Sequence, residues 1–376
     1  MNKKHAVIFV GTRPEALKLV VLYLLLKQAG VRVTLCATGQ HSELVGKALE
    51  PFGVMPDQFI ELERKGSDLC ELSSLLFHKS GEFLERSQPS LCVVQGDTTT
   101  ALVAGMASFY KKIPVIHVEA GLRTSGIDLP FPEEFNRRLI SQFSALDFAP
   151  TVSTYQQLIA EGKKPDDVYE VGNTIVDAMF YVVEQLKNAS YRDRFVSKEV
   201  SALAKRENLI LFTCHRRENI GQPMKDIAWA LHEIATSRNC NIVFPYHPNP
   251  VVYETFNGIL GELRNVHFIP AQNYPSFIEL QQRSKVVITD SGGIQEECAS
   301  LGIPFVVIRD ETERPEALLK PEFQLVGANT QRVISVIGDL LNNQSLYDEL
   351  TVKRFPFGDG TSSQKIVQVL RDRAMI

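Results

Sequence analysis

The stretch LCVVQGDTTTALVAGMASFYKKIPVIHVE, residues 91–119, decides the fold class. It begins with the uncharged run LCVVQG, continues with a helix-like segment at 99–112, and ends in a second apolar run, IPVIHVE. Two buried strands joined through a helix form a βαβ unit, in which the strands are parallel and helices cover the sheet. The stretch therefore predicts an α/β domain, and it leaves Asp97 and Glu119 at the ends of its strands.

The same alternation of apolar runs and helix-like segments continues along the whole chain. A first series of expected strands lies at 5–11, 31–37, 91–96, 113–119, 145–150 and 168–172. A second series lies at 209–214, 241–246, 265–270, 285–290, 304–308 and 323–327. Two series of similar extent predict two doubly wound parallel-sheet domains, at 1–172 and 173–376. The last helix, at about 362–376, has no assigned parent domain, and packing on the N-terminal domain is one option.

Length and composition agree with a two-domain globular protein. The chain has 376 residues, and its 44% hydrophobic and 22% charged residues are ordinary values. A net charge of −4 argues against a nucleic-acid surface. The apolar run LVVLYLLL is far shorter than the roughly 20 residues of a membrane span, so no membrane partner and no signal peptide are expected. The six cysteines are scattered without a CxxC pair, which favours reduced thiols and a cytoplasmic protein.

Three carboxylates follow strands in the first half of the chain, or lie in the loop beyond one: Asp97, Glu119 and Glu133. Crowding of acids raises at least one pKa, and a carboxyl group can thereby become a general base or acid near neutral pH. The structural alternative is that each acid pairs with a nearby arginine, Arg123 or Arg137. Ligands of open α/β sheets bind beyond the carboxyl ends of the strands, so we expect the site in the cleft between the two domains.

Two further motifs are suited to anions. In FVGTRPEALK, Arg13 and Lys18 bring positive charge to the start of a helix, where the helix dipole favours an anion over a cation. In TDSGGIQEE, 289–297, two glycines between a strand and a helix form a phosphate cradle without the Walker lysine. Glu297, about one turn inside that helix, could reach a pair of ribose hydroxyls.

Two histidines are less informative. His215 stands beside two arginines, which favours either a neutral imidazole or an anionic partner. His117 lies two residues from Glu119 on one strand, and this spacing could serve a metal. No third group of ligands has standard spacing, so no metal is expected. No dinucleotide-binding fingerprint follows a strand, so no nicotinamide cofactor is expected.

A resemblance to a known family extends from Gly11 to about Gly360. The motifs that carry it are GTRPEALK, TGQH, QGDTTT, HVEAGLRT, FPEEFNRR, VGNTIVDA, CHRREN, DSGGIQEE and RDETERPEA, in that order. They resemble the non-hydrolysing UDP-N-acetylglucosamine 2-epimerases. The resemblance implies a GT-B architecture of two Rossmann-like domains and a homodimer. It also implies interconversion of UDP-N-acetylglucosamine and UDP-N-acetylmannosamine for surface polysaccharides, by elimination of UDP through a glycal and its re-addition.

The resemblance also implies roles for individual residues. It implies acid–base roles for Asp97, Glu119 and Glu133. Other active-site roles fall on Lys18, Arg137 and His215. UDP-binding positions fall on Arg13, Phe277, Ser291, Gly292, Gly293, Glu297 and Arg314. Which carboxylate removes the proton and which returns it stays open.

One stretch departs from the family pattern. Gln40 and His41 match part of a site where bacterial members bind a second UDP-N-acetylglucosamine as an activator. The stretch ERKGSDLCEL lacks the glutamine that the family has there, so activation by the substrate stays open. The alternatives in function are an epimerase of a related UDP-2-acetamido sugar, a GT-B glycosyltransferase, a nucleotide-sugar binding protein, and a hydrolysing epimerase.

Overall fold

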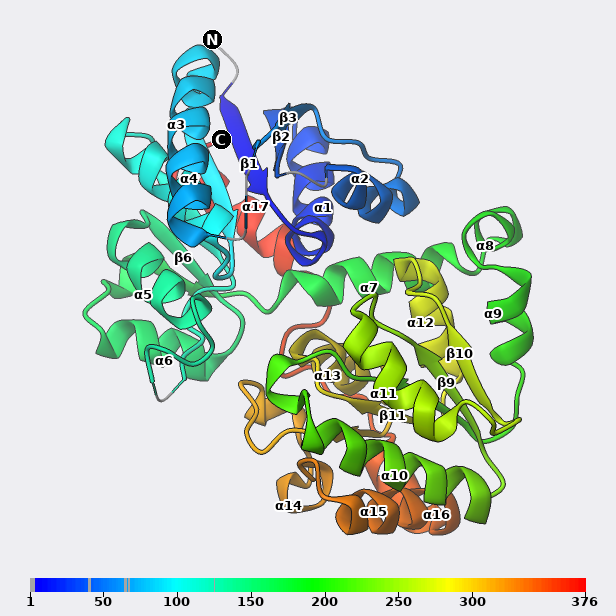
Figure 1. Ribbon diagram of the computed structural model, residues 1–376. Coiled ribbons are helices and arrows are strands. Elements are labelled where there is room, and N and C mark those ends of the chain that lie inside the picture. Colours follow the sequence, from blue (N-terminus) through cyan, green and yellow to red (C-terminus); the bar gives the residue numbers. More distant parts are fainter. Residues whose placement is uncertain (1–3, 40–41, 64–65, 67, 125) are drawn as a thin grey trace. The chain divides into compact units, whose positions relative to one another are not determined.

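The computed structural model describes residues 4–39, 42–63, 66, 68–124 and 126–376. The chain divides into two compact units: unit 1 is Met1–Phe180 with Phe357–Ile376, and unit 2 is Tyr181–Pro356. Each unit is an α/β layer structure with its own parallel sheet (Figure 1). The predicted class of two doubly wound, Rossmann-like units is thereby confirmed.

Over the described residues, the sheet of unit 1 has seven parallel strands in the order β3-β2-β1-β4-β5-β6-β7. The strands are β1 (His5–Val10), β2 (Arg32–Thr38), β3 (Gln58–Ile60), β4 (Leu91–Gln95), β5 (Val115–Val118), β6 (Leu146–Ala149) and β7 (Val168–Glu170). The central strands β1, β4 and β5 are buried along their whole length, because helices cover both faces of a doubly wound sheet. Their continuous apolar sequence is the reason they could be recognised in the chain.

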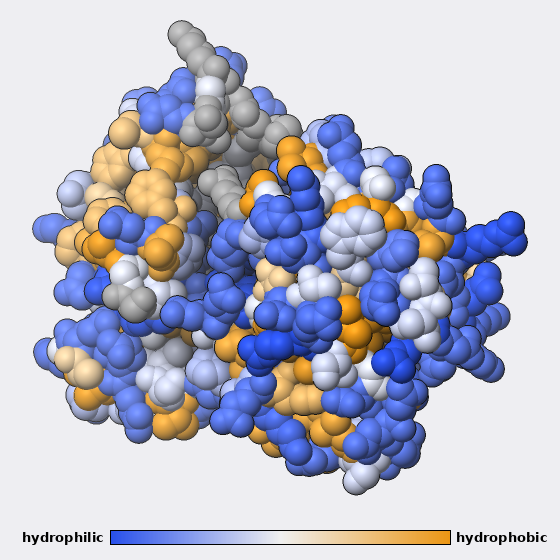
Figure 2. All heavy atoms as spheres, turned by 60° about the horizontal axis from the view of Figure 1, so that its bottom comes forward, coloured by the Kyte–Doolittle hydropathy of each residue, from blue (hydrophilic) through white to orange (hydrophobic). Residues whose placement is uncertain are grey.

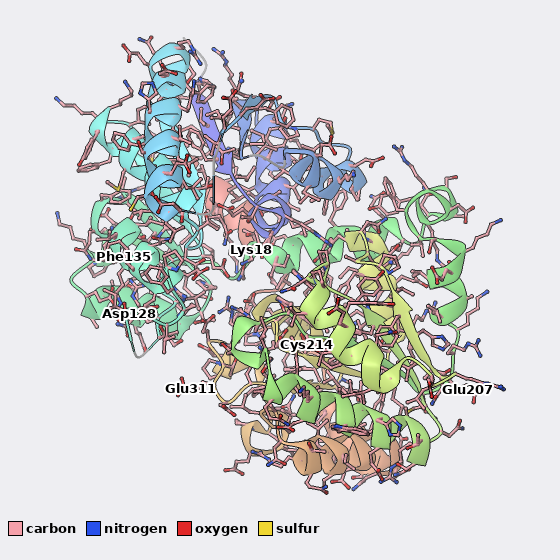
Figure 3. All side chains as sticks on the ribbon, viewed as in Figure 1. Lys18, Asp128, Phe135, Glu207, Cys214 and Glu311 are labelled. Carbon is pink, nitrogen blue, oxygen red and sulfur yellow. The ribbon has the colours of Figure 1, made fainter. Side chains whose placement is uncertain are left out.

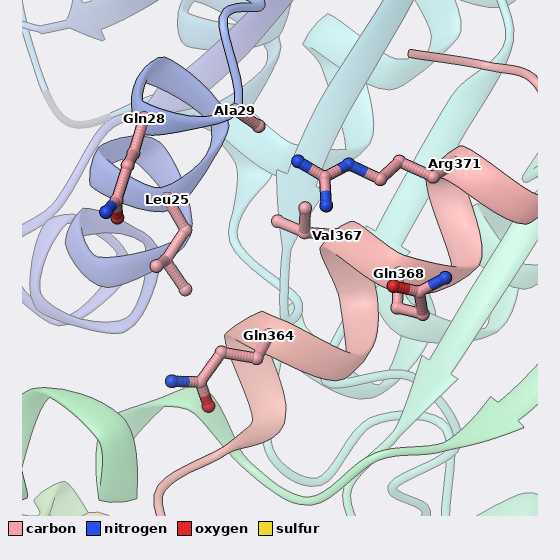
Figure 4. A pocket seen from close by; sticks show the side chains of 7 residues that line it. All are labelled: Leu25, Gln28, Ala29, Gln364, Val367, Gln368 and Arg371. Carbon is pink, nitrogen blue, oxygen red and sulfur yellow. The ribbon is translucent and has the colours of Figure 1, made fainter.

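The helices of unit 1 come from both ends of the sequence. They are α1 (Arg13–Gln28), α2 (Ser42–Leu49), α3 (Leu69–Ser87), α4 (Thr99–Tyr110), α5 (Glu133–Phe143), α6 (Val152–Ala160), α17 (Ser362–Asp372) and the part of α7 (Thr174–Gln185) up to Phe180. The C-terminal helix α17 lies against α1 (Figure 1). Figure 4 shows the groove between them, which is lined by Leu25 and Gln28 of α1, by Ala29 directly after it, and by Gln364, Val367, Gln368 and Arg371 of α17.

Unit 2 repeats the plan with a five-stranded parallel sheet over the described residues, in the order β10-β9-β8-β11-β12. The strands are β8 (Leu209–Thr213), β9 (Asn241–Pro245), β10 (Val266–Ile269), β11 (Val286–Thr289) and β12 (Phe305–Val307). The helices are α8 (Ala189–Phe195), α9 (Lys198–Leu203), α10 (Gln222–Ser237), α11 (Pro250–Leu260), α12 (Tyr274–Arg283), α13 (Gly292–Leu301), α14 (Pro321–Gln324), α15 (Thr330–Asn342) and α16 (Gln344–Leu350). Side chains of α10, α11 and α15 form one core with the sheet.

The structure differs from the expected strands in two places. The run 323–327 is not a strand: Pro321 begins the short helix α14, and only Leu325 forms an isolated bridge to Val307. The side-chain oxygen of Gln324 accepts the backbone N–H groups of Leu319 and Lys320, which stabilises this turn. Conversely, the edge strand β3 was not predicted, because three residues with mostly exposed side chains carry too little pattern.

The division between the units lies inside α7, after Phe180, rather than at residue 172. The first turns of α7 belong to unit 1 because they hold the C-terminal segment. Asp177 accepts the backbone N–H groups of Ser362 and Ser363, at 3.3 and 2.6 Å. The helix α17 is accordingly part of unit 1. In the described part of the chain, no helix has the length and apolarity needed to cross a membrane.

Candidate active site

Each sheet has a point where the strand order reverses, and the predicted residues gather beyond the strand ends there. In unit 1 this point lies between β1 and β4, and in unit 2 it lies between β8 and β11. Ligands of doubly wound sheets bind at such switch points. Figure 3 shows Lys18 on α1 of unit 1 and Cys214 after β8 of unit 2.

The turn from β1 into α1 is built around Glu15. Thr12 caps α1, and the Glu15 carboxylate accepts hydrogen bonds from Thr12 Oγ1 at 2.7 Å and from the Gly11 N–H at 3.1 Å. Its other oxygen accepts from Thr98 Oγ1 at 2.7 Å, at the start of α4. Gly11 has to be glycine, because a Cβ there would lie 2.1 Å from Thr100 Oγ1. Glu15 thus ties together the two turns that flank the switch point.

Burial raises the pKa of Glu15 to about 7 from 4.5, although the hydrogen bonds from Thr98 and Thr12 act in the opposite direction. A raised pKa means that the folded protein favours the protonated form of Glu15. The resulting stabilisation is fully present below the pKa of the unfolded chain, and it is lost as the pH rises through about 7. Between pH 5 and pH 8 we therefore expect Glu15→Gln to gain roughly 2–3 kcal/mol of stability relative to the unchanged protein. Urea unfolding of both proteins at several pH values measures this difference, and a difference independent of pH would contradict it.

Glu119 follows β5 and is held in a strained conformation. Its backbone φ is +63°, which is rare for a residue other than glycine and costs about 1–3 kcal/mol. Its Oε2 accepts from Lys18 Nζ at 2.5 Å and from the side-chain amide of Gln95, and its Oε1 accepts from Asn173 Nδ2 at 2.9 Å. The carboxylate is almost completely buried, and a Cβ on Gly96 would lie 3.5 Å from Oε2. Glu119 is therefore fixed beside the turn that carries Asp97.

Asp97 lies next to the N-terminal half of α5. Its Oδ2 is 3.3 Å from Nη2 of the buried Arg137, and its backbone carbonyl accepts from Asn136 Nδ2 at 2.8 Å. Glu133 is the first residue of α5, one turn before Arg137, and its side chain is partly exposed. The structure thus brings Asp97, Glu119 and Arg137 together with Lys18. Asp97 therefore pairs with Arg137, as in the structural alternative, whereas Glu119 pairs with Lys18.

The other charged residues of this region have structural partners. Arg123 binds Glu161 in a two-pronged ion pair, with distances of 2.8 and 2.6 Å. The fully buried Glu134 accepts from Arg138 Nε at 2.6 Å and from the Thr124 N–H at 3.1 Å. These pairs shape the loop between β5 and α5. Among the residues that the structure describes, no group of three His, Cys, Asp or Glu side chains could hold a metal ion.

In unit 2, His215 has an anionic partner, the buried Asp290 at the end of β11. Nδ1 of His215 lies 3.0 Å from Asp290 Oδ1. The backbone N–H groups of His215 and Arg216 both donate to Asp290 Oδ2 at 2.8 Å, and Asn219 Nδ2 donates at 3.1 Å. Burial by itself would raise the pKa of Asp290, but the hydrogen bond and charge of His215 and the two backbone donors lower it to about 2. A stacked ring, His247, lies 6.1 Å from the His215 ring between centroids.

The start of α13 is suited to phosphate. Ser291 is the N-cap and makes no side-chain cap bond, and Gly292 and Gly293 form the first helical positions. The guanidinium of Arg314 lies over this end of the helix, as shown by the distance of 3.4 Å between its Cζ and the position that a Cβ on Gly292 would take. Arg314 is oriented by the fully buried Glu296, which accepts from its Nε at 2.6 Å. Backbone N–H groups, the helix dipole and an arginine thus point to a site for an anion.

Glu297 of α13 is connected to α12, the helix that carries Phe277, through a hydrogen bond from Tyr274. Glu297 is buried, and its Oε1 accepts from the hydroxyl of Tyr274 at 2.7 Å. Phe277 lies three residues after Tyr274 on the same face of α12 and is partly exposed. A helix with a partly exposed aromatic ring therefore adjoins Glu297, the acid that follows the phosphate cradle.

Several polar residues of these two clusters were not predicted as site residues. They are Glu15, Gln95 and Asn173 in unit 1, and Tyr274, Asp290 and Glu296 in unit 2. Asp290 and Asn173 stand beside the predicted motif residues, and a polar residue directly after a buried strand was the signal available. Arg13 is the first, exposed residue of α1. Gln40 and His41 lie outside the described residues.

Comparisons with known proteins identify relatives along nearly the full length. A family model described as UDP-N-acetylglucosamine 2-epimerase matches residues 25–371. The chain is 38% identical over 375 residues to the UDP-N-acetylglucosamine 2-epimerase of Campylobacter jejuni, covering 98% of each chain. It resembles the crystal structure of UDP-GlcNAc 2-epimerase from Neisseria meningitidis bound to UDP-GlcNAc, with 36% identity, a TM-score of 0.90, and coverage of 98% and 100%. The Methanocaldococcus jannaschii enzyme in complex with UDP-GlcNAc and UDP is 29% identical, with a TM-score of 0.82 and coverage of 98% and 99%.

Proposed function

The chain belongs to the UDP-N-acetylglucosamine 2-epimerase family, and from this premise we propose that it interconverts UDP-N-acetylglucosamine and UDP-N-acetylmannosamine. It is an isomerase that inverts the second carbon of the sugar. The observation that carries the proposal is the buried Glu119 beside the Asp97 turn, together with the anion site of α13. The first cluster supplies proton-transfer groups, and the second supplies the groups that a nucleoside diphosphate needs.

We propose that the chemistry is an elimination followed by an addition. One carboxylate removes the proton from C2 while the C1–O bond to UDP breaks, so that a C1–C2 double bond forms in a glycal. UDP then re-forms the bond at C1, and a carboxylic acid returns a proton to the opposite face of C2. Two acid–base groups are needed, and Asp97, Glu119 and Glu133 are the candidates. Lys18 and Arg137 stabilise the charged forms of Glu119 and Asp97, respectively.

The nucleotide binds to unit 2 in this proposal. The free N–H groups of Gly292 and Gly293, with Arg314, hold the diphosphate. Glu297 accepts from the ribose hydroxyls while Tyr274 fixes its orientation, and Phe277 packs against the uracil. His215, paired with Asp290, adds to the charge around the phosphates. These contacts keep the detached UDP bound until it adds back.

The direct test is to incubate the purified protein with UDP-N-acetylglucosamine and separate the nucleotide sugars by anion-exchange chromatography. We expect UDP-N-acetylmannosamine to appear, and the same equilibrium mixture to form from either epimer. Release of free N-acetylmannosamine would indicate hydrolysis. Turnover only with a UDP-2,3-diacetamido sugar would move the substrate to a relative, and transfer of the sugar to an added acceptor would contradict the proposal.

We also propose that the enzyme is a homodimer and works in the cytoplasm. Unit 1 exposes an aromatic cluster, in which Phe109 and Tyr110 of α4 are 52% and 68% exposed and Tyr110 packs edge-on against Phe77 of α3. Figure 2 shows that apolar side chains form separate patches on a largely hydrophilic face. An aromatic cluster of this kind is typical of an interface between copies. All six cysteines are unpaired, which suits a reducing compartment.

Light scattering after size-exclusion chromatography tests the dimer. We expect a mass near twice the 42.1 kDa of one chain, and Tyr110→Lys should shift the protein toward the monomer. The control is Trp229→Lys, which changes another exposed aromatic residue, on α10 of unit 2. A monomeric mass for the unchanged protein would contradict this part of the proposal.

A further inference from the structure

A chain of buried polar groups lies beneath the Asp97 turn and takes no part in the chemistry proposed above. His117 of β5 and Asp147 of β6 are opposite one another in the sheet, and both are fully buried. His117 Nδ1 lies 3.2 Å from Asp147 Oδ1, and Asp147 Oδ2 lies 2.7 Å from Lys163 Nζ. Ser144 Oγ donates to the same carboxylate at 2.8 Å. The other ring nitrogen of His117, Nε2, is 2.8 Å from the carbonyl oxygen of Gly96.

The Gly96 carbonyl needs this side-chain donor because the backbone ladder ends there. Gly96 still donates its N–H to Val118 of β5 at 2.9 Å. Ala120, two residues further along, donates its N–H to Phe148 of β6 at 3.0 Å instead of to β4. The intervening residue, Glu119, turns the chain with its positive φ. Since a carbonyl oxygen only accepts, Nε2 of His117 carries a hydrogen and donates a hydrogen bond to the Gly96 carbonyl.

A buried ionic group in the middle of a parallel sheet is unfavourable unless it is fully satisfied, and apolar residues usually occupy such positions. Burial by itself would raise the pKa of Asp147, but the hydrogen bond from His117 and the charge of Lys163 outweigh it, so that the pKa is lowered. The carboxylate is therefore ionised and anchors the imidazole ring. The ring, in turn, contacts the residue directly before Asp97.

We propose that His117 is a positioning residue for Asp97. Asp147, which is itself paired with Lys163, anchors the His117 ring. The Nε2–H of this ring then fixes the Gly96 carbonyl, and the orientation of Gly96 determines where the Asp97 carboxylate lies after the end of β4. Asn136 fixes the same turn from the other side, through the carbonyl of Asp97 itself. Glu119 has its own separate support from Lys18, Gln95 and Asn173. The inference rests on the proposed function, because it assigns His117 a task for Asp97, one of the candidate proton-transfer groups.

Two amide substitutions of His117 can separate its effect on the position of Asp97 from its effect on the stability of the fold. In His117→Gln the longer side chain places its amide near the position of Nε2, so the donor to Gly96 is kept and the contact with Asp147 is lost. In His117→Asn the shorter amide reaches toward Asp147 and the donor to Gly96 is lost. Each variant removes one of the two contacts of one buried ring, so both should lower the melting temperature to a similar extent.

The activities of the two variants should differ. We expect His117→Asn to lower kcat by roughly 100-fold with little change in KM, because a shift of about 1 Å in a catalytic group has this effect. His117→Gln should stay within about tenfold of the unchanged enzyme, since its donor to Gly96 remains. In D₂O, the ratio of deuterium entering the recovered substrate to net epimerisation should change in His117→Asn only, because one proton-transfer group is displaced and the other is not.

Equal losses of kcat in the two variants, in proportion to their melting temperatures, would overturn the inference and leave His117 a purely structural residue. An unchanged ratio of exchange to epimerisation in His117→Asn would overturn it as well. Absence of epimerisation by the unchanged enzyme would be a different result, because it would contradict the proposed function itself.

Discussion

Glu119→Gln is expected to lower the rate of epimerisation by roughly 10²–10⁴-fold while UDP binding is kept. Lys18, Gln95 and Asn173 all donate hydrogen bonds to the carboxylate. A glutamine amide in either orientation therefore points its NH₂ group at a donor, and it cannot accept a proton from C2. Epimerisation rates and calorimetry with UDP measure the two effects separately.

The control for this variant is Glu85→Gln, because Glu85 also pairs with a lysine, Lys111, at 3.1 Å, but does so on the surface of unit 1. Exposed pairs of this kind contribute about 0–1 kcal/mol, so activity and stability should be unchanged. Retention of C2–H exchange in Glu119→Gln would remove this residue from the chemistry. Loss of UDP binding together with activity would instead indicate a general structural defect.

Gly172→Ala is expected to destabilise unit 1 by about 3 kcal/mol or more, from backbone strain and overpacking together. Gly172 has a φ of +93°, and a Cβ there would lie 2.6 Å from Ser362 Oγ and 2.9 Å from the carbonyl oxygen of Phe357. These atoms belong to the returning C-terminal segment, whose Phe357 carbonyl accepts from the Asn173 N–H at 2.7 Å. The methyl group would push this segment away and disturb Asn173, a partner of Glu119.

Gly162→Ala is a matched control. Gly162 has a φ of +94°, and apart from its chain neighbours no atom of the described residues lies within 4 Å of the position that a Cβ would take. It carries the backbone strain without the steric clash, so a loss of only about 1 kcal/mol is expected. Thermal unfolding and limited proteolysis at the C-terminal segment measure both variants. Equal losses of stability would show that packing of the C-terminal segment against Gly172 is unimportant.

The sequence predicted most strongly those features that depend on continuous apolar runs. The buried strands of both sheets are visible because helices cover both faces, so few polar residues interrupt them. Beyond their ends, Asp97, Glu119 and Ser291 stand out as polar or small residues at the point where ligands bind. The edge strand β3 and the turn at 321–324 were missed or misjudged, because short exposed segments are decided by tertiary contacts and by a single proline.

The partners of the site residues could not be predicted from sequence. Arg123 was a candidate partner for a carboxylate of the site, yet it binds Glu161, 38 positions away. Asn173, which binds Glu119, is 54 positions away from it, and Asp290, which binds His215, is 75 positions away. Such pairs depend on the order of the strands in a sheet, and the local pattern of apolar and polar residues carries no information about that order. The left-handed conformation of Glu119 is likewise a result of these contacts.

The most direct test of the central claim is proton NMR of UDP-N-acetylglucosamine incubated with the enzyme in D₂O. Elimination and re-addition remove the hydrogen at C2 and return one from solvent. We therefore expect UDP-N-acetylmannosamine with deuterium at C2, while the anomeric C1 hydrogen is retained. UDP-N-acetylmannosamine formed without deuterium at C2 would contradict proton transfer by Asp97, Glu119 and Glu133, and with it the account of this site.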